Sequence, residues 1–153
     1  MSTPSDEPRW AASAGTLATR IRAGALTSVE AVETCLERIA AVNPALNAVV
    51  AFAPDALERA RAADARLARG ELDGPLHGVP FTIKDSNDTA GLVTTAGTIG
   101  WRQRVPDGDG TVVARLRAAG AILLGKTNTP EFTWSDETDN DVYGRTSNPY
   151  DLE

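Results

Sequence analysis

A strand–helix–strand pattern between residues 81 and 125 constrains the fold more than any other feature of the sequence. Residues 81–83 (FTI) and 121–125 (AILLG) are short apolar runs that predict buried strands. The segment between them is expected to hold a helix that is capped by Asp109 or Thr111 and runs through Ala119. Strands joined in this way lie parallel with a right-handed crossover, and buried parallel strands need helices on both faces. The sequence therefore predicts an α/β fold.

The first 70 residues predict mainly helices. Thr27 and Glu30 have the spacing of a capping box, and apolar residues then recur at helical intervals until Asn43-Pro44. Around this helix the sequence predicts three further elements, namely a helix over 10–23, a buried strand within 47–53 and a helix over 55–69 that ends at Gly70.

Charge and composition exclude several classes of protein. The 21 acidic and 15 basic residues give a net charge of -6, and the basic residues are spread along the chain, so a nucleic-acid-binding face is not expected. No run of ~20 apolar residues could span a membrane, and no signal peptide is visible, so a cytoplasmic location is expected. With one cysteine, Cys35, and one histidine, His77, we expect neither a disulfide nor a structural metal.

Lysine is rare in this chain. Only Lys84 and Lys126 are lysines, while 13 basic residues are arginines. An ammonium group can lose its proton near neutral pH when it is desolvated, and a guanidinium group cannot. Lys84 follows the apolar run at 81–83, where desolvation would disfavour its charged form and make it usable as a base. The alternative is that Lys84 reaches the surface or pairs with a distant carboxylate.

A local serine–lysine dyad is not expected. If the strand continued to Ser86, that residue would lie ~7 Å from Lys84, whereas a base must come within ~3 Å of the proton that it accepts. Ser135 and Ser147 lie in a polar, turn-rich tail and are interpreted as capping or turn residues. His77 is flanked by turn residues and is expected to be structural.

Four segments carry a family resemblance, and they occur in this order: PLHGVPFTIKD, TTAGT, DGTVVARLRAAGAILLGKTNTPEF and TDNDVYGRTSNPYDLE. From residue 75 to the last residue the chain resembles the amidase-signature (Ser-cisSer-Lys amidohydrolase) family, and the helix-rich residues 10–70 resemble its N-terminal lead-in. The resemblance implies a mixed β-sheet flanked by helices, incomplete in this chain. It also implies that residues 1–153 are the N-terminal segment of a single amidase domain.

The resemblance assigns roles to individual residues. Lys84 corresponds to the catalytic lysine of the triad, and no metal or cofactor takes part. Lys126 is interpreted as structural, and Asp85 and Asn128 as supports of the site. In that family the bridging serine and the nucleophile follow the Asn-Pro-Tyr-Asp-Leu segment, so the chain is expected to be inactive alone.

Two alternatives to an amide hydrolase stay open on the sequence. The chain could be a non-catalytic interaction or assembly module derived from an amidase, or part of the A subunit of a tRNA-dependent amidotransferase. The expected partners are a small-molecule amide, for the complete enzyme, and either the missing C-terminal polypeptide or a second copy of the chain. Neither a nucleic acid nor a membrane is expected as a partner.

Overall fold

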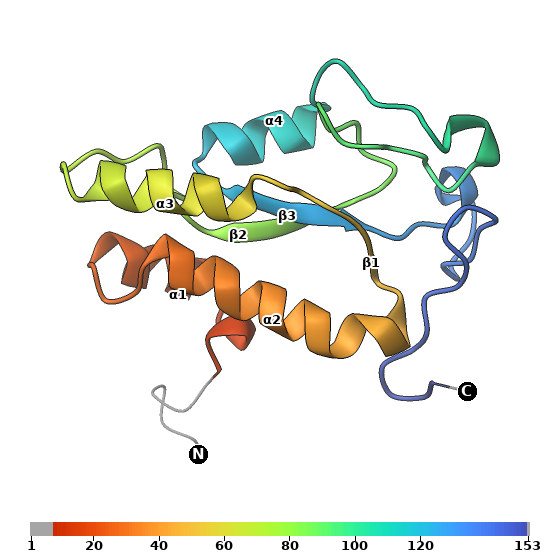
Figure 1. The fold of residues 1–153 in the computed structure, drawn as a ribbon, viewed down its shortest axis with the longest axis horizontal. Coiled ribbons are helices and arrows are strands. Elements are labelled where there is room, and N and C mark those ends of the chain that lie inside the picture. The colour runs from red at the N-terminus through yellow and green to blue at the C-terminus, as the bar shows by residue number, and fades with distance from the viewer. Residues whose placement is uncertain (1–7, 153) are drawn as a thin grey trace. The chain divides into compact units, whose positions relative to one another are not determined.

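The computed structural model describes residues 8–152 (Figure 1). These residues divide into two compact units. Unit 1 consists of residues 8–38, Pro54–Phe81 and Leu116–Leu123. Unit 2 consists of Ile39–Ala53, Thr82–Arg115 and residues 124–152. Each unit is assembled from segments that are distant in the sequence.

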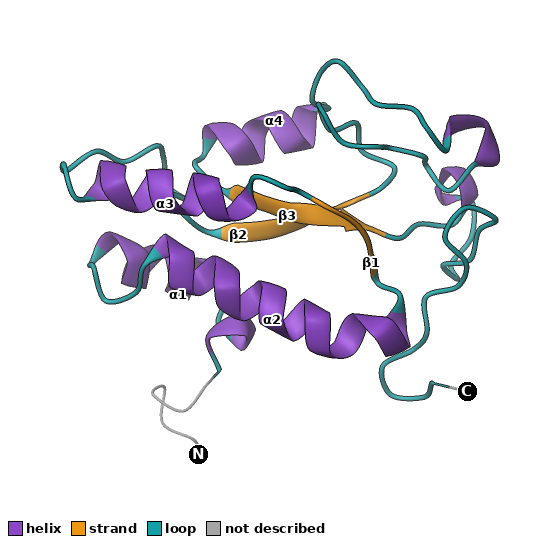
Figure 2. Ribbon diagram, in the orientation of Figure 1, coloured by secondary structure: helices purple, strands orange, loops and turns teal. Residues whose placement is uncertain are grey.

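Three strands form one sheet in the order β1-β3-β2 (Figure 2). They are β1 (Val49–Phe52), β2 (Pro80–Lys84) and β3 (Ile122–Thr127). β1 runs antiparallel to β3. β2 and β3 run in the same direction, because Ile122 N donates to Val79 O and, further along both strands, Asp85 N donates to Thr127 O, each at 2.8 Å. The sheet is therefore mixed, and the parallel pairing predicted from the sequence is confirmed.

The central strand β3 is the buried one. Residues Ile122 to Lys126 are all buried, as its near-continuous apolar sequence predicts. Gly125 is required by packing against β1, because a Cβ atom at this position would collide with the carbonyl oxygen of Ala51. The close approach of the two backbones thus depends on the absence of a side chain.

Seven helical segments complete the described chain. Four are α-helices, namely α1 (Ala14–Arg22), α2 (Ser28–Leu46), α3 (Ala56–Leu67) and α4 (Thr111–Ala118). Three are single 3₁₀ turns, at Arg9–Ala11, Ile99–Trp101 and Glu131–Thr133. Among residues 8–152, no helix is both long enough and apolar enough to cross a membrane.

The capping box of α2 is confirmed. Glu30 N donates to Thr27 Oγ1 at 3.0 Å, and Thr27 N donates to Glu30 Oε2 at 2.9 Å. Asp64 of α3 adds two bonds, because its carboxylate accepts from the backbone N–H groups of Ser28 (2.6 Å) and Val29 (3.1 Å). Four groups that a helix start leaves without intrahelical partners are thereby satisfied.

An apolar cluster lies beside this helix start in unit 1. Its buried members are Leu17, Ile21, Leu26, Ala31 and Val79. Leu17 and Ile21 are four residues apart on α1, so both side chains lie on one face of that helix. The sequence predicted this helix over 10–23, and it is observed over Ala14–Arg22. It begins later than predicted because Ser13 caps its start by accepting from Thr16 N.

The predicted end of α2 at Asn43-Pro44 is wrong. The helix continues through Pro44 to Leu46, and its last turn is closed by the bond from Asn47 N to Asn43 O. Asn47 then takes the left-handed conformation, with φ of 54°. The Asn43 side chain accepts from Ala48 N and Val49 N at 2.8 Å each, which leads the backbone from the helix into β1.

Candidate functional site

Lys84 is the last residue of β2 and is half-buried. A turn over Asp85 and Ser86 follows it, closed by the bond from Asn87 N to Lys84 O at 2.9 Å. The strand therefore ends before Ser86. Asn87 Nδ2 also donates to Lys84 O, at 3.3 Å. The backbone of Lys84 is thus held at the point where the strand becomes a loop.

Asp85 is fully buried and held by several hydrogen bonds. Its Oδ2 atom accepts from Thr95 N at 2.9 Å and from Thr95 Oγ1 at 2.6 Å. Its backbone N–H donates to Thr127 O of β3, and its carbonyl accepts from Ala96 N at 3.3 Å. The second carboxylate oxygen, Oδ1, has no hydrogen-bond partner, although Lys126 Nζ lies 3.7 Å away. That separation is too long for a hydrogen bond but short enough for strong Coulomb attraction.

Lys126 is fully buried on β3, and its ammonium group lies within unit 2. Nζ donates to Thr89 Oγ1 at 2.9 Å, to Thr94 Oγ1 at 3.0 Å and to the carbonyl oxygen of Asn87. An ammonium group has three N–H donors, and three acceptors surround it. The structural interpretation of Lys126 agrees with this geometry.

Burial perturbs the proton affinity of both members of this pair. Desolvation lowers the pKa of Lys126 to about 8, although the carboxylates of Asp85 and Asp88 act in the opposite direction. Desolvation also raises the pKa of Asp85, against the effect of the Thr95 hydrogen bonds and the positive charge of Lys126. The lysine that was interpreted as structural from the sequence therefore has a pKa lowered by its burial.

Asn128, the other expected support of the site, lies at the centre of a separate network in unit 2. Its Oδ1 atom accepts from Thr129 N (3.0 Å) and Asn140 Nδ2 (2.8 Å). Its Nδ2 atom donates to Gly144 O (2.9 Å) and Thr146 Oγ1 (3.0 Å). Every hydrogen-bonding position of this amide is used, so Asn128 fixes the loop after β3 and leaves no group free to bind a ligand.

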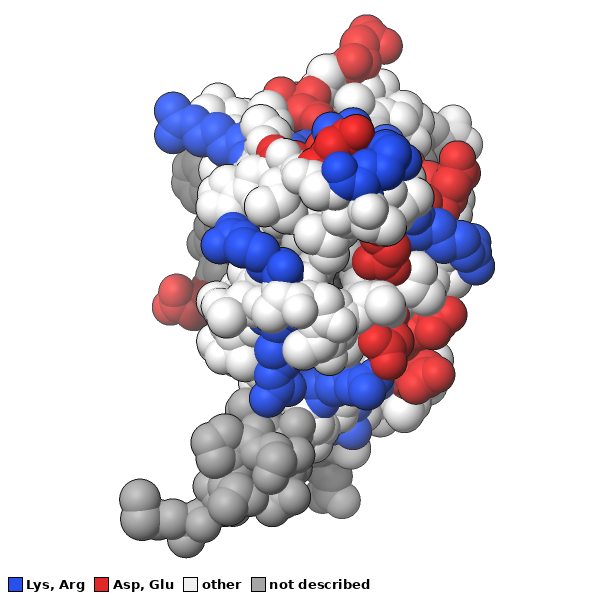
Figure 3. All heavy atoms as spheres, turned by 90° about the vertical axis from the view of Figure 1, so that its left-hand side faces the viewer, with Lys and Arg blue, Asp and Glu red and all other residues white. Residues whose placement is uncertain are grey.

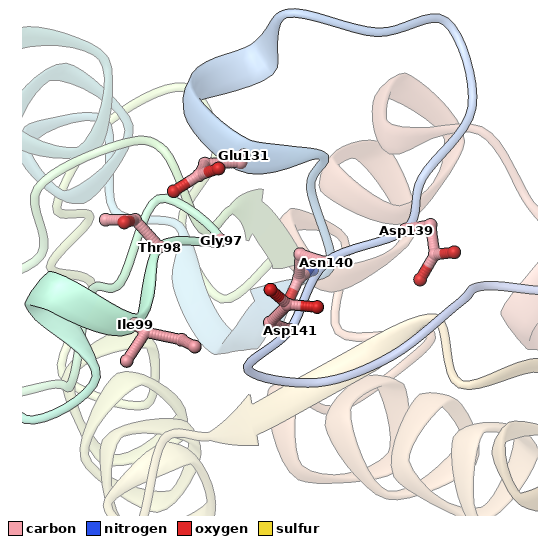
Figure 4. Close-up of a pocket in the computed structure, with 7 residues that line it drawn as sticks. All are labelled: Gly97, Thr98, Ile99, Glu131, Asp139, Asn140 and Asp141. Carbon is pink, nitrogen blue, oxygen red and sulfur yellow. The ribbon is translucent and has the colours of Figure 1, made fainter.

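A cavity of about 340 Å³ opens beside this network. Figure 4 shows the stretch Gly97–Ile99 on one side, Glu131 above it, and Asn140 and Asp141 projecting from a separate loop that also carries Asp139. Gly97 has φ of 72°, and a Cβ atom there would lie 2.9 Å from Thr129 O. Although three carboxylates line the cavity, no group of three potential metal ligands close enough to hold an ion occurs among residues 8–152.

His77 lies in unit 1 and is buried. Its Nδ1 atom accepts from Asp73 N at 3.0 Å, so the ring donates from Nε2 to Ala63 O, also at 3.0 Å. Both ring nitrogens are used within the unit, as expected for a structural histidine.

Charged side chains of both signs are interspersed on the face drawn in Figure 3. The salt bridges within unit 1 include Arg66 with Asp73 at 2.7 Å and Arg9 with Glu30 at 2.9 Å. This pattern gives that face no extended region of one charge.

Comparison with known proteins now defines the class. The family model described as Amidase matches residues 30–153, and the chain therefore belongs to the amidase family. Over 145 residues it is 46% identical to an indoleacetamide hydrolase from Bradyrhizobium diazoefficiens, with 94% of this chain and 28% of that enzyme covered. The family resemblance seen in the sequence is thereby confirmed.

Two further proteins are similar to the chain. The A subunit of a glutamyl-tRNA(Gln) amidotransferase from Acidothermus cellulolyticus is 46% identical over 140 residues, with 89% of this chain and 27% of that protein covered. The structure of a peptide amidase from Stenotrophomonas maltophilia superposes with a TM-score of 0.83 at 39% identity, with 95% of this chain and 31% of that enzyme covered. The expected fold class is confirmed, and the chain spans about three tenths of the length of these relatives.

Proposed function

We propose that the polypeptide containing these residues is an amidase that hydrolyses carboxylic amides, with Lys84 as the base of a Ser-cisSer-Lys triad. The observation that carries the proposal is the match of residues 30–153 to the amidase family. The matched residues include the Ile-Lys-Asp segment that contains Lys84. The half-buried position of Lys84 at the end of a strand, with its carbonyl held by Asn87, supports it. A base needs such a fixed position, because proton transfer requires contact within ~3 Å.

The proposed reaction follows the family pattern. A neutral Lys84 amine accepts the proton of a bridging serine, which in turn accepts the proton of the nucleophilic serine. The nucleophile adds to the amide carbonyl, and the amide nitrogen of the substrate leaves as ammonia or an amine after it has taken up the proton held by Lys84. Water then hydrolyses the acyl-enzyme to the carboxylic acid. Backbone N–H groups are expected to stabilise the oxyanion. Neither serine is assigned to a residue of this chain.

Lys84→Ala tests the role of the lysine in the complete polypeptide. We expect turnover to fall by ~10³-fold or more with the fold retained, and Lys84→Arg should not restore it, because arginine stays protonated. Arg61→Ala, which removes an exposed arginine of α3, is the matched control and should leave turnover unchanged. Near-normal turnover in the Lys84→Arg variant would remove Lys84 from the mechanism.

The substrate class can be found with an ammonia-release assay. The assay uses a panel of amide substrates chosen after two relatives of the chain. Indole-3-acetamide represents the indoleacetamide hydrolase, and a C-terminal peptide amide represents the peptide amidase. Glutamine is included to represent the amidotransferase. We expect release from at least one simple amide without ATP or any partner protein.

The second candidate function is that of an amidotransferase A subunit. The 46% identity to such a protein favours it. This function would be selected over the simple amidase if glutamine were the only amide of the panel to release ammonia and if the release required added partner subunits. A non-catalytic assembly module would give no release in either case.

The 153-residue chain by itself should not react with a serine-directed fluorophosphonate, because the proposal assigns neither serine to it. Labelling that disappears in a Ser86→Ala variant would contradict this expectation. The same measurement on the complete polypeptide should give one labelled serine, in the cytoplasmic fraction of the producing cell.

Large apolar side chains that are exposed on unit 2 support the expectation of a polypeptide partner. Ile99, Trp101, Phe132 and Trp134 are exposed to 52%, 40%, 46% and 90%, and the rings of Trp101 and Phe132 pack edge to face at 5.3 Å. Exposed apolar groups of this size mark association surfaces. We expect the chain alone to self-associate in sedimentation equilibrium, and a monodisperse monomer with a sharp thermal transition would contradict that.

A further inference from the structure

We propose that Lys126 is a positioning residue for Lys84, because its buried ammonium group fixes the loop that begins directly after Lys84 and binds the Lys84 carbonyl group. The proposal rests on the proposed function of Lys84 and adds to it a second lysine that does not touch the substrate. It concerns residues of unit 2 only.

Lys126 joins the two arms of the loop that follows β2. On the first arm its Nζ atom binds Asn87 O and Thr89 Oγ1, and on the second arm it binds Thr94 Oγ1. Thr89 and Thr94 are buried, so neither bond competes with water. A single charged group on the rigid central strand therefore sets the separation of both arms.

The connection from this group to Lys84 is short. Asn87, whose carbonyl binds Lys126, donates to the carbonyl of Lys84 through its backbone N–H (2.9 Å) and its side chain (3.3 Å). Asp85, 3.7 Å from Lys126 Nζ, is bonded to β3 and to Thr95. A movement of the ammonium group would therefore move Asp85 and Asn87, which follow Lys84 in the chain and hold its carbonyl end.

Stability alone gives no reason for a lysine at position 126. A buried ion pair carries a desolvation cost, and apolar residues of similar volume often replace such pairs without loss. Lys126 is also unsuited to be a second base, since it is fully buried and its three N–H donors face three acceptors. Unlike an apolar residue, Lys126 forms hydrogen bonds that hold its three acceptors at fixed distances from one another.

The test uses fluorophosphonate labelling of the complete polypeptide, which does not require the natural amide to be known. The variant Asp85→Asn/Lys126→Met removes both charges, so that neither remains buried without its partner. We expect the maximal labelling rate to fall by ~10²-fold, the cost of a small misplacement of a reacting group. The fluorophosphonate concentration that gives the half-maximal labelling rate should stay within about twofold of the parent value. Lys126→Arg should lower the maximal labelling rate less than the double substitution does.

Non-additivity separates positioning from a general structural effect. In a Lys84→Ala background the double substitution should cause no further loss, because it acts through Lys84. The control is Asp88→Asn/Arg104→Gln, which removes a half-exposed ion pair of the same loop with bonds of 2.6 and 2.7 Å. Its labelling rate should stay within about twofold of the parent.

Each outcome decides the question. A folded Asp85→Asn/Lys126→Met variant with an unchanged labelling rate would overturn the proposal, as would an equal loss in the control. If the variant does not fold, Thr94→Val takes its place, with a loss of several-fold expected and an unchanged rate overturning the proposal. Full labelling of Lys84→Ala would instead refute the proposed function, whatever the Lys126 variants do.

Discussion

The interiors of unit 1 and unit 2 are built from different groups. Unit 1 packs an apolar cluster around Leu17 and Ile21. Unit 2 buries charged and polar side chains where β2 and β3 end, and among the described residues eight of the ten buried polar or charged side chains belong to it. These eight are Asp85, Thr89, Thr94, Thr95, Lys126, Asn128, Thr129 and Asn140.

The difference shows two ways of specifying a structure. Apolar packing is non-directional and tolerates exchanges of similar volume. A buried polar network stabilises only when every donor and acceptor finds its partner, and it then fixes angles and distances. The unit that carries Lys84 is the one with the directional interior, which suits a group that must be held in place for proton transfer.

The largest expected effect is that of Lys126→Met on stability. It leaves the Asp85 carboxylate buried without its cation, and we expect the free energy of unfolding to fall by about 4 kcal/mol. Denaturant titration of the complete polypeptide measures this value. Adding Asp85→Asn should recover at least half of the loss, and a double variant as unstable as the single one would show that unit 2 depends on shape rather than on charge balance.

In unit 1, Ile21→Ala should lower the free energy of unfolding by about 3 kcal/mol, because it leaves a cavity in the apolar cluster. Ile21→Val should lower it by only about 1 kcal/mol. The same titration distinguishes them. If the two variants were equally unstable, the cluster would be as sensitive to shape as the polar interior, and the contrast between the units would fail.

Thr27→Ala removes the exposed capping box of α2 and should cost about 1 kcal/mol. Its control is Glu37→Ala, an exposed substitution within the same helix that leaves the cap intact and should have almost no effect. A loss as large as that of Lys126→Met would mean that exposed polar contacts of unit 1 matter as much as buried ones of unit 2.

The smallest expected effect concerns pH. Because the pKa of Lys126 is lowered to about 8 in the folded protein, the unfolded chain binds more protons at this site between pH 8 and the ordinary lysine value of 10.5. The free energy of unfolding should therefore rise as the pH passes through the folded-state pKa of Lys126, by on the order of 0.5 kcal/mol between pH 7.5 and 8.5. The measurement is the difference in free energy of unfolding between the parent protein and the Asp85→Asn/Lys126→Met variant as a function of pH. A decrease of this difference with rising pH would contradict the expected sign.

The elements of both units could be predicted from the sequence because their signals are local. The capping box at Thr27 and the apolar run of β3 both lie within a few residues of the structure that they specify. Pro44 misled the prediction of the end of α2, because the bond from Asn47 N to Asn43 O keeps two further residues helical and the side chain of Asn43 then binds Ala48 N.

The contacts of the candidate site could be predicted only in part. Lysine scarcity drew attention to both Lys84 and Lys126, but the surroundings of Lys126 come from residues 32 to 41 positions away in the sequence. No local pattern encodes how the loop after β2 folds back to bring Thr89 and Thr94 to the same ammonium group. Directional networks between distant residues become visible only once the backbone is known.

The strand order β1-β3-β2 has a consequence for how the chain is made. The central strand is the last of the three to leave the ribosome, so β1 and β2 are synthesised before either has its partner in the sheet. Unpaired strand edges promote wrong association in incomplete chains. During translation, the interval between the synthesis of β2 and that of β3 is therefore the time in which both earlier strands lack their partner, and β3 ends it by pairing with one edge of each.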